Sequence, residues 1–483
     1  MNRFKVDGSA GCRYVDNAVA SRAGRVGLSL LAALLTVSCV MPANLPNSAS
    51  AGASAPVTTT AATKATTATT AASAAPISPD PLSQQVRDLS AQQTQPVLNT
   101  LQQMTAIESG SLDLEGLAQM AQFIGKRLGD AGMQVQMLAS QAPDFHPILK
   151  GQKLGSIVFA TLKGSGKKSV MLIAHMDTVY LKGMAAKQPF RIDGNRAFGL
   201  GISDDKGGVA LVLHTVELLQ RIGFRDYAEL AVLINADEEI GSPGSGAMIA
   251  QKGAEYDAVF SFEGGGGERD MVRLATSSIA IATLKVTGRA SHAGANPEGG
   301  RNALYELAHQ ILKSKDLGDN AKGLKINWTV AKAGDVRNVI PADATATADI
   351  RALTNEDLDQ IESALRASIK EKLIADTKVE LDFLRSRPAF RANDASRALA
   401  RHAVSVFREL GRDMEIRDRA TGGGTDAAFA GMRPKGGVLE SFGTRGFGAH
   451  SNDAEYIFID SIQPKLYLST RMVMDVGRGL VSW

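Results

Sequence analysis

The chain has 483 residues, of which 44% are hydrophobic and 21% charged, so it is long enough for more than one globular domain with a buried core. Its 53 basic and 50 acidic residues nearly balance, which excludes the strongly basic surface of a nucleic-acid-binding protein. The two cysteines, Cys12 and Cys39, both lie near the N-terminus, so the rest of the chain has neither a disulfide framework nor a thiolate metal site.

The N-terminus has the pattern of an export signal. Basic residues precede an apolar run of 15 residues, 26–40, which is short for a transmembrane helix and typical of a secretory signal. The position of Cys39 resembles that of the cysteine at a lipoprotein cleavage site. Cleavage by the ordinary signal peptidase, after Ala43 for example, is an equal alternative. We expect a signal over residues 1–41, a location in the periplasm or cell envelope, and membrane contact only through a lipid anchor.

Residues 42–81 are rich in Ala, Thr, Ser and Pro. This composition buries too little apolar area to offset the entropy of ordering, so we expect a disordered tether. The first part of a catalytic domain is expected over residues 82–276. The segment 80–140 has helical periodicity, and two β-rich runs, 156–162 and 169–174, are predicted to form neighbouring strands.

Several apolar runs in this region end abruptly in histidine or acids. Parallel strands joined by helices bring such strand ends to one edge of a sheet, where α/β proteins bind ligands. The helix expected over residues 206–222 starts at the same edge. The converging side chains are His175 and Asp177, then Asp204, then Glu238 and Glu239, and finally Glu263.

The pattern changes after residue 276. Strands and helices then alternate in the order β-α-β-β-α-β, which is typical of a ferredoxin-like domain, here inserted over residues 277–388. The second part of the catalytic domain is expected over residues 389–483, including the glycine run around Gly423, which we interpret as a backbone wall of a substrate pocket. The inserted elements are expected at 279–287, 302–315, 324–331, 345–352, 355–375 and 378–384.

Histidine and carboxylate ligands without cysteine favour zinc or a similar divalent ion. A two-metal hydrolytic site needs ligands on each ion, a carboxylate that bridges them, and a base beside the attacking water. Asp177 suits a partner for the imidazole N–H of His175. Glu238, next to Glu239, suits the general base. The candidate metal ligands are His175, Asp204, Glu239, Glu263 and His450.

Four separated motifs, AHMDTV, SDDKGG, DEEIGS and GAHSNDAEY, occur in the order found in a known enzyme family. The chain resembles the aminoacylase/carboxypeptidase family of di-zinc metallopeptidases, most closely the bacterial glutamate carboxypeptidases of the carboxypeptidase G type. Further segments, such as RPAF and TGGGTDAAFA, extend the resemblance over most of residues 90–480. It implies an α/β zinc-peptidase domain with a mixed or parallel sheet and an inserted ferredoxin-like domain for lid and dimer contacts.

The resemblance also implies roles for single residues. Asp204 would bridge two Zn²⁺ ions, with His175 and Glu263 on one ion and Glu239 and His450 on the other. Glu238 would be the general base, with Asp177 behind His175. The peptide bond Asp204–Asp205 is expected to be cis.

In the lid, Asn338 and Arg351 would bind the terminal carboxylate of the substrate. His292 would reach the active site of the partner subunit of a homodimer and stabilise the oxyanion. Arg269 and Arg273, near Glu263, could recognise a carboxylate on a substrate side chain. Met271 stands where the family usually has lysine, a departure that leaves the preference for glutamate open.

The sequence therefore predicts a zinc-dependent carboxypeptidase that removes a C-terminal residue, with glutamate expected, from small peptides, folates or N-acyl amino acids. One alternative is an N-acyl amino acid deacylase or dipeptidase of the same family. Another, of a different class, is a non-catalytic periplasmic lipoprotein that binds metal or peptides. No nucleic-acid partner is expected.

Overall fold

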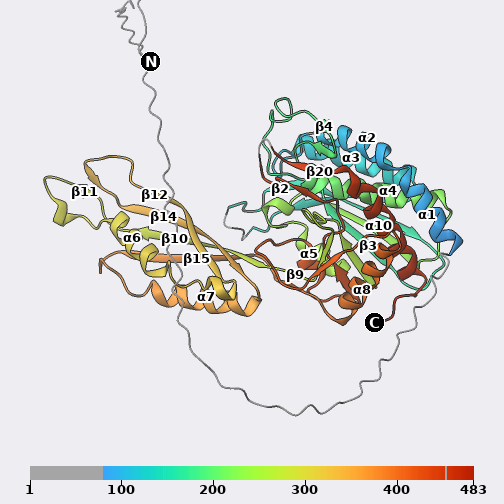
Figure 1. Ribbon diagram of the computed structural model, residues 1–483. Coiled ribbons are helices and arrows are strands. Elements are labelled where there is room, and N and C mark those ends of the chain that lie inside the picture. The colour runs from blue at the N-terminus through green and yellow to red at the C-terminus, as the bar shows by residue number, and fades with distance from the viewer. Residues whose placement is uncertain (1–79, 145, 147, 452–453) are drawn as a thin grey trace, which may run out of the picture. The chain divides into compact units, whose positions relative to one another are not determined.

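The computed structural model describes residues 80–144, 146, 148–451 and 454–483 (Figure 1). The expected signal segment 1–41, with Cys39, and all but the last two residues of the expected tether lie outside these described residues. Within them, no helix is both long enough and apolar enough to cross a membrane.

The main body is built on a six-stranded mixed sheet with the order β1-β2-β6-β3-β7-β18. The last four strands in this order run parallel to one another, and β1 and β2 are antiparallel to their neighbours. The strands are β1 (Gln134–Gln141), β2 (Lys153–Lys163), β3 (Val170–His175), β6 (Glu229–Asn235), β7 (Ala258–Ser261) and β18 (Gly437–Leu439).

Helices cover both faces of this sheet because its four parallel strands are apolar and buried on both sides. Along β3, Leu172 packs into a core shared with α1–α4, α8 and α10, and Ile173 packs into a core shared with α5 and α9. The helices are α1 (Pro81–Ala91), α2 (Thr94–Thr105), α3 (Leu114–Asp130), α4 (Gly207–Arg221), α5 (Gly246–Gly253), α8 (Asp394–Arg408), α9 (Ala427–Ala430) and α10 (Ile462–Gly477).

Two sequence predictions for this body are wrong. The helical segment predicted over 80–140 ends at Asp130, and β1 follows, because Gly132 adopts a positive φ that stops the helix. The strands β2 and β3 are also not neighbours, since β6 lies between them and pairs with both. Strands that are close in sequence often pair directly, which is why β2 and β3 were expected to be neighbours. After β3 the chain passes through α4, and the next strand of the sheet, β6, lies between β2 and β3.

A second sheet, with its own apolar core, lies within residues 278–387. Its strands follow the order β12-β14-β10-β15, all antiparallel, with α6 and α7 packed on the apolar face. The element order along the chain is β-α-β-β-α-β, as the sequence pattern predicts. The elements are β10 (Ser278–Thr287), α6 (Ala303–Ser314), β12 (Lys325–Ala333), β14 (Asp343–Ala352), α7 (Asn355–Ser368) and β15 (Lys378–Arg387).

Short strand pairs complete the described fold. One four-stranded sheet has the order β19-β20-β5-β4, and three two-stranded pairs are β11–β13, β16–β9 and β17–β8. Their bounds are β4 (Arg191–Asp193), β5 (Arg196–Phe198), β8 (Met271–Arg273), β9 (Ala275–Thr276), β11 (Ser291–His292), β13 (Val339–Ile340), β16 (Phe390–Arg391), β17 (Glu415–Arg417), β19 (Gly446–Phe447) and β20 (Tyr456–Phe458).

Candidate metal centre

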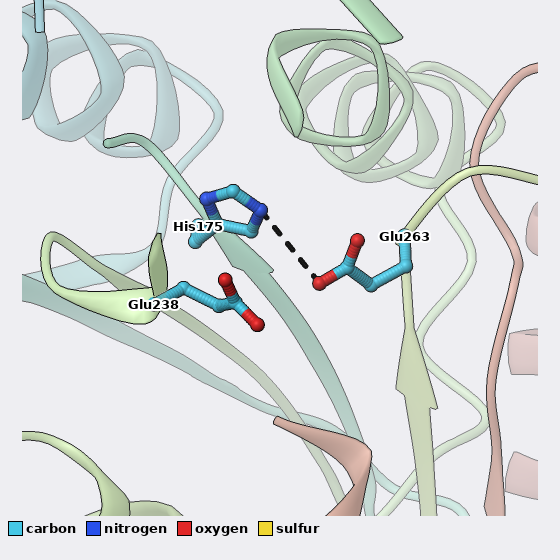
Figure 2. A group of neighbouring side chains, drawn as sticks. All are labelled: His175, Glu238 and Glu263. Atoms are coloured by element: carbon cyan, nitrogen blue, oxygen red, sulfur yellow. Dashed lines mark ion pairs between the residues drawn. The ribbon is translucent and has the colours of Figure 1, made fainter. Parts of the chain in front are cut away.

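The carboxyl ends of three parallel strands carry the predicted acids and histidine. β3 ends at His175, β6 ends three residues before Glu238, and β7 ends two residues before Glu263. Because these strands are adjacent and parallel, their ends meet at one edge of the sheet. Figure 2 shows the three side chains pointing toward one another at this edge.

Asp204 lies between the two predicted metal ligand sets. Its Oδ1 is 3.0 Å from Nε2 of His175, and its Oδ2 is 3.3 Å from Nε2 of His450. Nε2 of His175 is also 3.6 Å from Oε1 of Glu263 (Figure 2), and Nε2 of His450 is 3.1 Å from Oε2 of Glu239. The two carboxylate oxygens of Asp204 thus face different histidines, as a bridging ligand requires.

Ligand-type atoms gather in two groups, within 4.8 Å of one another in each. One group is Asp204, Glu239 and His450, and the other is His175, Glu263 and Glu238. Glu238, predicted to be the base, therefore lies at ligand distance in the second group. The peptide bond Asp204–Asp205 is cis, as the resemblance implies.

Asp177 is completely buried behind His175. Its Oδ1 is 3.3 Å from Nδ1 of His175 and accepts a hydrogen bond from the backbone N–H of Glu238 at 3.1 Å. Its Oδ2 accepts from the N–H of Glu239 at 3.1 Å and from the hydroxyl of Ser111 at 2.7 Å. One carboxylate thus orients the histidine and the loop that carries both glutamates, which is the function of a partner behind a metal ligand.

Glu455 is a second buried carboxylate that orients the site, here by fixing the backbone around Asp204. It was not singled out from the sequence. Its buried carboxylate accepts hydrogen bonds from the N–H groups of Gly201 (2.8 Å), Ser203 (2.7 Å) and Asp204 (3.1 Å), and from the Tyr180 hydroxyl at 2.5 Å. Five residues after His450, Glu455 therefore ties the histidine loop to the backbone of the central aspartate. Its place in the GAHSNDAEY motif was the available signal.

Arg387 is the second residue that the sequence analysis missed, although it opens the RPAF segment. It ends β15 and is 97% buried, with its Nη1 paired to Oε1 of Glu238 and its Nη2 donating to the backbone oxygen of Glu238 at 2.7 Å. Burial raises the pKa of Glu238 to about 7, although the positive charge of Arg387 acts to lower it. Nε of Arg387 is buried without a hydrogen-bond partner among the described residues.

The charges of this cluster fit a bound cation. Burial raises the pKa of Glu239 and raises that of Glu263 well above the usual range, and the charges of neighbouring carboxylates such as Asp204 raise both further. Oε1 of Glu239 is buried with no hydrogen-bond partner within the described part of the chain. A divalent ion would satisfy that oxygen and balance the carboxylates, and imidazole with carboxylate oxygens is a donor set that zinc accepts.

A cavity of about 460 Å³ opens over the cluster. Both Arg351 and Gly423 line it, as does Arg387. Arg351 is also held by Asp349, whose Oδ1 lies 2.8 Å from its Nε. Two of the four expected substrate-side residues are therefore placed with the metal cluster.

The other two do not line this cavity: His292 ends β11, and Asn338 directly precedes β13, the strand that pairs with β11. Both side chains are exposed, and Nδ1 of His292 accepts hydrogen bonds from the N–H groups of Gly294 and Ala295 at 3.1 and 3.0 Å. Within a single chain the structure does not bring them to the metal cluster.

A second cavity, of about 630 Å³, adjoins the first, and Asp204 and Glu263 line both. Three arginines face it, together with the apolar side chains of Met271 and Phe447. Two of these arginines were singled out from the sequence for a possible carboxylate contact. The three are Arg269, Arg273 and Arg417.

This sheet, with its acids and histidines at the carboxyl edge, is the arrangement of a metallopeptidase, and comparison with known proteins agrees. The model of the peptidase family M20/M25/M40 matches residues 171–475. The chain belongs to this family and is a metal-dependent peptidase.

Among curated relatives, carboxypeptidase G2 of Pseudomonas sp. (strain RS-16) is 43% identical over 383 residues, which cover 79% of this chain and 90% of the relative. A succinyl-diaminopimelate desuccinylase of Xanthomonas oryzae pv. oryzae (strain PXO99A) is 27% identical, with 70% of this chain and 92% of the relative covered. The first relative is similar over nearly its whole length.

Solved structures confirm the mixed α/β fold. Aminopeptidase PepT from Bacillus cereus ATCC 10987 matches with a TM-score of 0.63 and 19% identity, covering 79% of this chain and 98% of that one. The M20 family metallo-carboxypeptidase Sso-CP2 from Sulfolobus solfataricus matches with a TM-score of 0.62 and 16% identity, covering 78% and 98%. At these identities the likeness concerns the fold.

Proposed function

We propose that this chain is a zinc-dependent carboxypeptidase that hydrolyses the amide bond to a C-terminal amino acid, with glutamate as the expected residue. The expected substrates are small peptides, folates and N-acyl amino acids. The observation that carries the proposal is the placement of Asp204 between two ligand groups, beside Glu238, in a cavity that Arg351 and Arg387 also line. Support also comes from the similarity to carboxypeptidase G2.

For the metal we propose two Zn²⁺ ions per subunit. His175 and Glu263 would hold one ion, Glu239 and His450 the other, and Asp204 both. When bound, such ions polarise a substrate carbonyl and lower the pKa of water, which is the chemistry that amide hydrolysis needs.

Glu238 would act as the general base. It takes a proton from the attacking water and passes it to the leaving nitrogen. Burial raises its pKa, so this carboxylate takes up a proton more readily than a solvated glutamate does. Its pairing with Arg387 keeps its carboxylate in the cavity and competes with direct metal ligation.

The leaving amino acid carries a carboxylate, and a guanidinium group binds a carboxylate through two parallel hydrogen bonds. Arg351 lines the cavity for this contact, and Asn338 would add an amide hydrogen bond. His292 would stabilise the oxyanion. Since His292 and Asn338 lie outside the cavity of their own chain, we propose that they act across a homodimer formed through the inserted domain.

Export belongs to the same proposal. The N-terminal signal pattern and the tether that follows it would place the enzyme in the periplasm or cell envelope, released or anchored by a lipid on Cys39. Mass measurement of the mature protein distinguishes these two forms.

The test is amino acid release by zinc-loaded protein from matched substrates: N-benzoyl-glutamate and a folate-type glutamate, their alanine counterparts, and unblocked dipeptides. Preferential glutamate release from the blocked substrates supports the proposal. Faster turnover of N-acetyl amino acids or of dipeptides favours the deacylase or dipeptidase alternative. Zinc binding without turnover of any substrate contradicts an enzymatic role and favours the binding protein.

A further inference from the structure

We propose that the cavity of about 630 Å³ beside Asp204 and Glu263 is the subsite for the acyl half of the substrate, and that it selects acyl groups ending in a negative charge. This inference rests on the proposed function, because it takes Glu238 as the general base. It also moves Arg269 and Arg273 from the C-terminal side chain, where the sequence suggested them, to the opposite half of the substrate.

The position of the base decides which half of the substrate lies where. Glu238 must return its proton to the leaving nitrogen, so that nitrogen lies within hydrogen-bond reach of its carboxylate. Glu238 lines the cavity of about 460 Å³ and not the larger one. The leaving amino acid therefore occupies the smaller cavity, where Arg351 is available for its carboxylate.

The acyl half then extends in the other direction. Asp204 and Glu263 line both cavities, so the scissile carbonyl lies where the cavities meet. From there the larger cavity is the continuation on the side away from Glu238. Its volume lies within the range of roughly 300–1,000 Å³ that small-molecule sites occupy.

Three guanidinium groups line this larger cavity. Arg269 is exposed and makes no hydrogen bond or ion pair to any described residue. Arg273 donates to the hydroxyl of Ser441 at 2.5 Å, and its guanidinium is 4.0 Å from Glu440. Arg269 is thus a cation without a fixed partner at the cavity wall.

Arg417 is the third cation. It pairs with Glu415 at 3.1 Å, but both side chains are partly exposed, so water screens this pair and it is weak. Apart from Asp204 and Glu263, which face the metal centre, Glu268 is the one acid that lines the cavity within the described residues. Arg269, which has no partner among the described residues, and Arg417, which is only weakly paired, outnumber the single acid Glu268 and favour an anionic occupant.

The apolar part of the lining defines the rest of the occupant. The Phe447 side chain, 42% exposed, and Met271 face the same space as the arginines. Met271 is held in place because the buried ammonium group of Lys465 donates to its backbone oxygen at 3.3 Å. The geometry therefore fits an acyl group with an apolar body and a carboxylate at its far end, such as a dicarboxylic acyl chain.

The test compares two acyl groups of the same shape, glutaryl and glutaramoyl, which differ only in a terminal carboxylate or carboxamide. Each is joined to glutamate and, separately, to alanine, and kcat/KM is measured with the zinc-loaded enzyme. We expect the acid to be preferred about tenfold with both leaving residues, as a charge-assisted hydrogen bond in a partly exposed site provides. The double variant Arg269→Gln/Arg417→Gln should reduce the preference to near parity.

Arg419→Gln is the matched control, because Arg419 is an exposed neighbouring arginine that does not line the cavity and contacts the backbone oxygen of Ala321. It should keep the wild-type preference. Equal kcat/KM for acid and amide in the wild type, or a preference that survives the double variant, overturns the acyl subsite.

The two proposals fail in different ways. Release of alanine but not glutamate, with the acid preference intact, contradicts the proposed leaving residue and supports the acyl subsite. Glutamate release without any preference between the acid and amide acyl groups supports the proposed leaving residue and contradicts the acyl subsite. Absence of hydrolysis with every substrate overturns both.

Discussion

The edge of the central sheet and the β11–β13 strand pair both carry residues expected to act on substrate, but they hold them differently. At the sheet edge, His175 is 1% exposed, and its neighbours are fixed by the buried carboxylates of Asp177 and Glu455. On the β11–β13 pair, His292 is exposed, and among the described residues its ring accepts hydrogen bonds only from the N–H groups of Gly294 and Ala295, which follow it in the chain.

This difference separates two tasks. The sheet edge is organised in advance, so its variants are expected to change metal binding as well as turnover. Within the described part of one chain, the β11–β13 pair does not contact the metal cluster, so variants of His292 are expected to change turnover alone. Each of the following predictions tests one side of this distinction.

The largest effect is expected for Glu238→Gln, which keeps the size of the side chain and removes the base. Turnover should fall by about 10³-fold or more, since general-base catalysis contributes roughly 10²–10⁴. Zinc content, measured by atomic emission, should stay at the wild-type value. A parallel loss of zinc would show that Glu238 is a ligand, as its position near His175 and Glu263 also permits.

His292→Ala is expected to lower kcat by about 10²-fold, the usual cost of one oxyanion donor. Zinc content and the melting temperature should not change, because the side chain is exposed. Mixing this variant with Glu238→Gln should restore activity, since a mixed dimer pairs an intact Glu238 with an intact His292 of the partner. If the subunits exchange and activity still does not recover, action across the dimer is contradicted.

Asp177→Asn tests the organisation of the sheet edge. The amide cannot accept from the N–H groups of both glutamates and the Ser111 hydroxyl while also pairing with His175. Zinc affinity is expected to fall about 10–100-fold, as for other partners behind metal ligands. Competition with a chelator measures the zinc affinity. An unchanged affinity would show that Asp177 does not support metal binding.

Glu455→Gln should have a smaller effect, a fall in zinc affinity of about tenfold, because one oxygen still accepts hydrogen bonds. The matched control is Glu229→Gln, which alters another tyrosine–glutamate pair, to Tyr256 at 2.5 Å, away from the centre. Equal losses of zinc affinity in both variants would reduce the role of Glu455 to general stability.

Much of the site was predictable from local sequence. Apolar strands ending in His175 or just before Glu263 indicate a sheet edge by themselves, and parallel pairing brings their ends together. Arg387 and Glu455 were not predictable in this way. Their partners lie 149 and about 250 residues away, and only the tertiary fold determines which buried carboxylate meets which N–H group.

The same reason explains the errors in the fold. The periodicity located most strands and helices within a few residues, but it could not show that β6 inserts between β2 and β3. Strand order depends on how the chain crosses over, and local pattern carries no information on it. The helix predicted over 355–375 also ends early, at Ser368.

The most direct test of the metal centre is the number of zinc ions per chain in the wild type and in His450→Ala, measured on the same dialysed preparations. The two ligand groups joined by Asp204 predict two ions in the wild type and one in the variant, since His175 and Glu263 keep their own ion. One ion in the wild type, or an unchanged count in His450→Ala, would contradict the two-metal centre.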